Sequence, residues 1–149
     1  AITGAVKWVF VLASLPYGLI VAAVLVGKHM DKIDADRKAG VRTIPVLLGI
    51  QGSATLLKIL AILFFVTVAL LPVFGIAGPW VAVVVLAIPP LVRAWRKWAA
   101  PKPSEPPAGW TVWPLWYVGW AMFFNRLAGL LLIAGLFIDF ILRLLFPGL

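Results

Sequence analysis

Four long apolar runs constrain this chain more than any other feature of its sequence. They cover about residues 6–28, 54–75, 79–97 and 115–146. Each is long enough to cross the hydrocarbon layer of a bilayer, about 30 Å thick, as an α-helix. Hydrophobic residues make up 64% of the 149-residue chain, more than one soluble domain of this length could bury. We therefore predict an all-α helix bundle of about four transmembrane helices, integral to the membrane.

The distribution of basic residues predicts how these helices are oriented. Nine of the 13 Lys and Arg residues lie at the ends of the first and third runs or in the connections that follow them: Lys28, Lys32, Arg37, Lys38, Arg42, Arg93, Arg96, Lys97 and Lys102. The turn at residues 76–79, between the second and third runs, holds no charge. Because cytoplasmic loops carry the excess of Lys and Arg, we expect both basic connections to face the cytoplasm from a cell or inner membrane.

Composition also bears on the classes of function. The chain has no cysteine, which excludes disulfides, iron–sulfur clusters and thiolate zinc sites, and its single histidine disfavours a multi-His metal site. We attribute the net charge of +8 to the basic connections and expect no nucleic-acid partner.

Acidic residues are concentrated in one segment, residues 28–49. Three of the five acidic residues, Asp31, Asp34 and Asp36, lie there among five basic ones. Carboxylates at a membrane surface suit Mg²⁺, which commonly bridges to phosphate, and neighbouring basic side chains would hold the remaining phosphate charge. Two interpretations are open from composition: a site for a lipid diphosphate at the end of the first helix, or a solvated, charge-balanced loop.

The segment DADRKAGVRTIPVLLG resembles the second Asp-rich motif of the UbiA-type intramembrane prenyltransferases. The shared residues are Asp36, Arg37, Gly40, Arg42, Thr43, Val46 and Gly49. The resemblance implies that residues 1–149 form the C-terminal half of a nine-helix domain, within membrane lipid. It also implies Mg²⁺-dependent transfer of a prenyl group from a prenyl diphosphate to an aromatic or other lipophilic acceptor. The N-terminal half, or a partner membrane subunit, would complete the site.

The resemblance assigns roles to the charged segment. Asp36 is the implied metal ligand, with Asp34 or Asp31 in support. The candidates for contact with the diphosphate are His29, Lys32, Arg37, Lys38 and Arg42. Asp36 and Lys32 are the predicted catalytic residues, because both would stabilise charge that develops on the leaving diphosphate.

Two positions depart from the family pattern. Lys32 stands where the family has a metal-binding Asp, four residues before Asp36, and His29 stands where the family often has Asn. On a regular helix these three residues share a face, and Asp31 and Asp34 point roughly the other way. Three hypotheses follow. A bulge brings Asp31 into the site, Lys32 contacts the diphosphate directly, or the chain is a non-catalytic subunit of a larger membrane complex that keeps only the fold.

Charged residues also interrupt the last apolar run. We expect Asp139 to pair with Arg143, one helical turn later. Arg126, beside Asn125, is expected to reach the lipid headgroups, with contact to a diphosphate as the alternative.

Overall fold

The computed structural model describes residues 7–146 and confirms the predicted all-α class. Four helical segments are long and apolar enough to cross a membrane. They are α1 (Trp8–Met30), α3 (Ile44–Val73), η1 (Pro79–Ala87) continued by α4 (Ile88–Ala99), and α5 (Tyr117–Leu145). A short helix, α2 (Ile33–Lys38), follows α1. The chain is therefore a multi-pass integral membrane protein.

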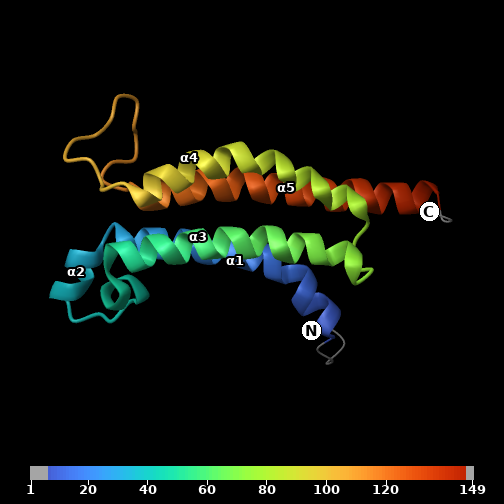
Figure 1. The fold of residues 1–149 in the computed structure, drawn as a ribbon, viewed down its shortest axis with the longest axis horizontal. Coiled ribbons are helices and arrows are strands. Elements are labelled where there is room, and N and C mark those ends of the chain that lie inside the picture. The colour runs from blue at the N-terminus through green and yellow to red at the C-terminus, as the bar shows by residue number, and fades with distance from the viewer. Residues whose placement is uncertain (1–6, 147–149) are drawn as a thin grey trace.

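The helices form two layers that run side by side (Figure 1). The first layer contains α1 and α3, and the second contains α5 with η1 and α4. Helix α1 also packs on α5, which joins the layers. Helix α2 and the connection from α4 to α5 lie at the same end of the bundle, so residues far apart in sequence meet there.

The core between the layers is apolar and partly aromatic. Phe64 of α3 and Phe124 of α5 are fully buried and meet edge to face, with ring centroids 6.0 Å apart. Trp98 of α4 packs on the other side of Phe124 at 6.4 Å. Such pairs contribute about 0.5–1.5 kcal/mol beyond the burial of their area, so this cluster helps to hold the layers together.

Helix α3 starts earlier than its apolar run predicts, at Ile44 rather than near residue 54. Pro45 lies in the first turn, where its missing N–H is not needed. The helix then bends at Gly49, whose φ of 69° is a conformation that glycine adopts without steric cost. The prediction began this span near residue 54 because it assigned residues 44–53, although they are mostly apolar, to the connection after the first run.

Candidate functional site

The predicted helix through the charged segment is interrupted. Helix α1 ends at Met30 and α2 begins at Ile33, with Asp31 and Lys32 in a turn between them. Lys32 has φ −115° and ψ 13°, outside the helical region. The regular helix on which the shared face of His29, Lys32 and Asp36 was drawn is therefore broken at these two residues.

Asp36 is held by residues on both sides of it in the sequence. The Nδ1 atom of His29, near the end of α1, lies 2.9 Å from Oδ2 of Asp36. The hydroxyl of Thr43 donates to the same oxygen at 3.3 Å. The chain returns to Asp36 through a tight turn at Gly40, which has a φ of 71°. Within residues 7–146 the other carboxylate oxygen, Oδ1, accepts no hydrogen bond, so the carboxylate is oriented and still has a free acceptor.

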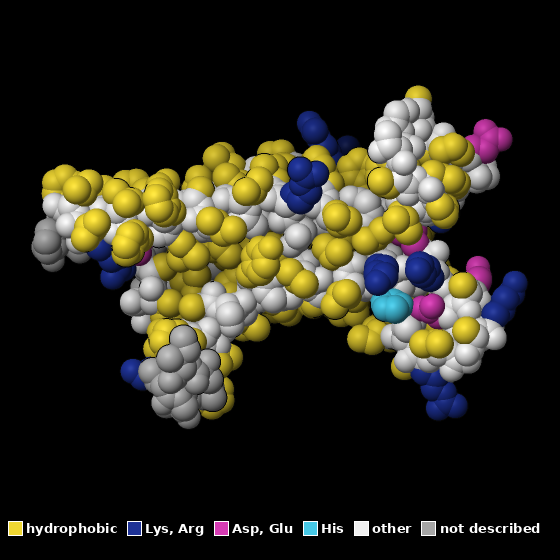
Figure 2. All heavy atoms as spheres, turned by 180° about the vertical axis from the view of Figure 1, so that it is seen from behind, with side chains coloured by type: hydrophobic (Ala, Val, Ile, Leu, Met, Phe, Trp, Pro, Cys, Tyr) yellow, Lys and Arg dark blue, Asp and Glu magenta, His cyan; other side chains and the backbone are white. Residues whose placement is uncertain are grey.

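Basic side chains surround this carboxylate at the end of the bundle. Lys32, Lys38 and Arg42 are exposed and form no ion pair within residues 7–146. Arg37 lies 3.3 Å from Asp34, but both side chains are largely exposed, so this pair adds little stability and can open at small cost. Figure 2 shows Lys or Arg side chains directly beside the histidine and an acidic side chain. This end of the molecule can therefore attract an anion.

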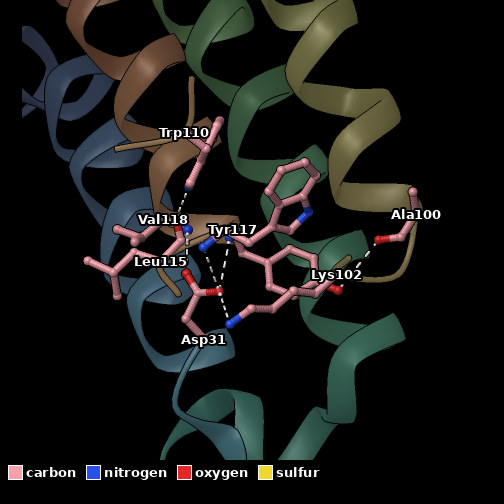
Figure 3. Close-up of polar contacts among 8 residues, drawn as sticks. Asp31, Ala100, Lys102, Trp110, Leu115, Tyr117 and Val118 are labelled. Carbon is pink, nitrogen blue, oxygen red and sulfur yellow. Dashed lines mark hydrogen bonds and ion pairs between the residues drawn. The ribbon is translucent and has the colours of Figure 1, made fainter. Parts of the chain in front are cut away.

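Asp31 has a different set of partners (Figure 3). Its Oδ1 accepts hydrogen bonds from the backbone N–H groups of Trp116 at 3.0 Å and Tyr117 at 3.1 Å, and its Oδ2 accepts one from Val118 at 2.9 Å. The ammonium of Lys102 lies 3.8 Å from Oδ1. The Asp31 side chain is only 1% exposed. Asp31 therefore connects the end of α1 to the start of α5.

This connection has a simple physical basis. The first N–H groups of a helix have no partner within the helix, and its N-terminus carries a partial positive charge. Helix α5 has no side-chain cap of its own, because Trp116 occupies the cap position. The carboxylate of Asp31 supplies the missing acceptors and the complementary charge from another helix.

The structure thus brings His29, Asp36 and Thr43 together and gives Asp31 and Asp34 other partners. Within residues 7–146 no group of three or more His, Asp or Glu side chains is placed to hold a metal. A role in metal binding for Asp31 and Asp34 stays a prediction. One carboxylate is nevertheless compatible with Mg²⁺, which is often held by one or two carboxylates together with the phosphates of its substrate.

A cavity of about 440 Å³ lies at this end of the bundle, between the α1–α2 break, the start of α3 and the connection after α4. Its charged lining residues are Asp31, Asp34, Arg37 and Lys102. Its volume is in the range of small-molecule sites. Sequence reasoning missed two contributors at this end of the bundle. Thr43, which holds Asp36, was matched only as part of the motif, and Lys102, which lines the cavity, was counted only as a loop charge.

The other charged residues of the last helix lie elsewhere. The predicted pair is confirmed: Nε of Arg143 is 3.0 Å from Oδ2 of Asp139, near the turn between α3 and η1. Arg126 and Asn125 line a cavity of about 320 Å³ with Tyr17 of α1. Whether Arg126 reaches lipid headgroups or a diphosphate stays a prediction.

Comparison of the sequence with known proteins gives a family and a relative. The sequence profile of the UbiA prenyltransferase family matches residues 1–115. The chain is 33% identical over 84 residues to the 1,4-dihydroxy-2-naphthoate octaprenyltransferase of Bacillus subtilis (strain 168). The aligned region covers 56% of this chain and 27% of that protein, so the chain spans about a quarter of its relative's length. No solved structure matches the chain.

Proposed function

The chain belongs to the UbiA prenyltransferase family, and we propose that it supplies one half of an intramembrane prenyltransferase. In this proposal a prenyl diphosphate lies with its headgroup at the α1–α2 break and its chain among the apolar helices. The acceptor is lipophilic and aromatic, of the class that the name of the Bacillus subtilis relative gives, 1,4-dihydroxy-2-naphthoate.

The observation that carries the proposal is the arrangement around Asp36. Its carboxylate is fixed by His29 and Thr43 and keeps Oδ1 free, at the end of an apolar bundle. Exposed cations lie in the same short segment. A fixed carboxylate suits one ligand position on Mg²⁺, and unpaired Lys and Arg side chains suit the remaining phosphate oxygens.

The proposed reaction breaks the bond between the first prenyl carbon and the diphosphate oxygen. The bonding electron pair leaves with the diphosphate, a carbon of the acceptor ring bonds to the prenyl carbon, and the ring then loses a proton. When bound, Mg²⁺ would neutralise charge on the phosphate oxygens. Lys32 and Arg42 would bind the departing diphosphate, and His29 and Thr43 would keep Asp36 oriented. Such donors lower the barrier because they stabilise charge that develops in the transition state.

The second candidate is a non-catalytic subunit that keeps the UbiA fold. The observation in its favour is Lys32, a cation at a position where the family pattern has a second carboxylate. Both candidates require the remainder of the domain, since the chain spans only about a quarter of the relative's length.

Substitution of Asp36 in the intact protein tests the proposal. We expect Asp36→Asn to reduce prenyl transfer by at least about a hundredfold, as for loss of other preorganised charge-stabilising groups, and to raise the Mg²⁺ concentration needed. Glu105→Gln is the matched control, because Glu105 is an exposed acid of the connection from α4 to α5 that forms no ion pair within residues 7–146. The measurements are transfer to 1,4-dihydroxy-2-naphthoate and binding of prenyl diphosphate across a Mg²⁺ titration.

Two results would contradict the proposal. Equal activity of Asp36→Asn and Glu105→Gln would place the diphosphate elsewhere. A parent protein that binds prenyl diphosphate and transfers it to no aromatic acceptor would support the non-catalytic subunit.

A further inference from the structure

A lateral groove separates α3 from η1 and α4, on a part of the molecule that excludes Asp36 and its partners. The deeper part of this groove has a volume of about 680 Å³. All of its lining residues are apolar; they include Ile62, Phe65 and Ala69 of α3 and Val85 and Ile88 on the opposite side. The groove can therefore hold a hydrocarbon chain but offers no polar partner along that depth.

The packing of η1 explains why this groove is open. Gly135 of α5 allows η1 to approach closely, since a Cβ at this glycine would lie 2.8 Å from the carbonyl oxygen of Trp80 and from Cα of Val81. The 3₁₀ helix η1 therefore packs directly against α5. Its other side, with small residues such as Ala82, does not fill the space toward α3.

A second cavity of about 470 Å³ follows along the same side of α3, toward the end of the bundle that carries α2. Its lining is polar as well as apolar and includes Gln51, Thr55 and Lys58 of α3 and Trp98 of α4. Lys58 precedes Ile62 of the apolar groove by one helical turn, so the two cavities follow one stripe of α3.

Lys58, at the polar end of the groove, lacks an acidic partner. The Lys58 ammonium lies 5.3 Å from the centroid of the Trp95 ring and forms no ion pair within residues 7–146. Trp98 is 1% exposed, and its indole N–H has no hydrogen-bond partner among the described residues. That nitrogen is closed to solvent, so of these two residues only Lys58 can offer a polar group to a ligand in the cavity. No Asp or Glu lines either cavity.

We propose that this groove binds an anionic membrane phospholipid, with its phosphate at Lys58 and an acyl chain between α3 and η1. The shape of the site matches an amphiphile: cationic and hydrogen-bonding at one end, and apolar throughout the rest. Trp95 lies one helical turn before the end of α4, so Lys58 reaches the depth at which lipid headgroups begin. An apolar transmembrane helix of another chain would contact the apolar groove but would leave the Lys58 ammonium without an anionic partner.

Binding of two phospholipids to the intact protein tests this proposal. Phosphatidylglycerol and phosphatidylcholine with the same acyl chains are added to the purified protein, and the bound lipid is counted by native mass spectrometry. We expect phosphatidylglycerol to bind about tenfold more tightly, the effect of one charge-assisted contact. Lys58→Gln should remove this preference. Arg93→Gln, which removes one charge from an exposed residue of α4 outside both cavities, should retain it.

A second variant tests the apolar part without changing a charge. Ala69 is exposed and lines the groove, so Ala69→Phe should fill it and weaken the binding of both lipids by a similar factor. If Lys58→Gln fails to fold, Ala69→Phe and a salt titration test lipid binding in the groove instead. A preference that persists at high salt, or lipid binding that Ala69→Phe leaves unchanged, would refute the site.

Three other outcomes would also overturn the proposal. Equal binding of the two lipids to the parent protein would leave Lys58 without a role in lipid choice. Equal effects of Lys58→Gln and Arg93→Gln would indicate attraction by net charge only. Displacement of phosphatidylglycerol by prenyl diphosphate would make the groove part of the substrate site.

Discussion

The contact between Asp31 and the start of α5 predicts a large loss of stability in Asp31→Ala. The substitution leaves the backbone N–H groups of Trp116, Tyr117 and Val118 without their acceptor. These three residues are only 3%, 3% and 6% exposed, so water has little access to replace the carboxylate. Each unsatisfied buried group costs about 1–3 kcal/mol.

The whole effect is smaller than the sum of three such terms, because the first turn of α5 can relax toward the surface. Loss of one partner from a buried charged contact typically costs about 3–5 kcal/mol, and we expect Asp31→Ala to lower the free energy of unfolding by this amount. Asp31→Asn keeps one oxygen, which can serve Trp116 and Tyr117, but turns an amide nitrogen toward Val118. We expect it to cost about 1.5–3 kcal/mol, the contribution of one hydrogen bond to a charged group.

Two measurements separate this structural role from a role in metal binding. The first is the free energy of unfolding from a reversible denaturant titration in micelles. The second is hydrogen exchange at the amides of residues 116–118, which should lose protection in Asp31→Ala. The control is Asp34→Ala, which removes an acid of the same segment that is 83% exposed and should change stability by less than about 0.5 kcal/mol.

A structural role for Asp31 would be refuted if Asp31→Ala and Asp34→Ala had the same free energy of unfolding and the amides of residues 116–118 exchanged as in the parent. If Asp31→Ala also raised the Mg²⁺ requirement for prenyl transfer, Asp31 would be a metal ligand. That result would support the hypothesis that a bulge at the end of α1 brings Asp31 into the site.

Further predictions concern Lys32 and the orientation in the membrane. In the intact protein, Lys32→Ala should weaken binding of prenyl diphosphate about ten- to a hundredfold, through loss of one charge-assisted contact; an unchanged affinity would exclude direct contact. Because the chain has no cysteine, single cysteines can report topology. A cysteine at position 77 should react with an impermeant reagent outside intact cells and one at position 104 should not, since the basic connections are expected to face the cytoplasm. Labelling at 104 alone would reverse the orientation.

The sequence determined the features that depend on local spacing. Apolar runs of sufficient length specify membrane helices, because each helix satisfies its own backbone hydrogen bonds in lipid. The pairing of Asp139 with Arg143 follows from one helical turn. The contact of His29 with Asp36 agrees with the shared face that their spacing predicts, although the helix between them is broken.

Only the tertiary structure decided what Asp31 does. Its partners are 85 to 87 residues away, in a helix whose start depends on the path of the Pro-rich connection. No local periodicity encodes that path, because it is set by how α5 packs on α1. The open groove between α3 and η1 has the same origin: the close approach that Gly135 allows draws η1 toward α5, and the space left on the other side belongs to no single segment.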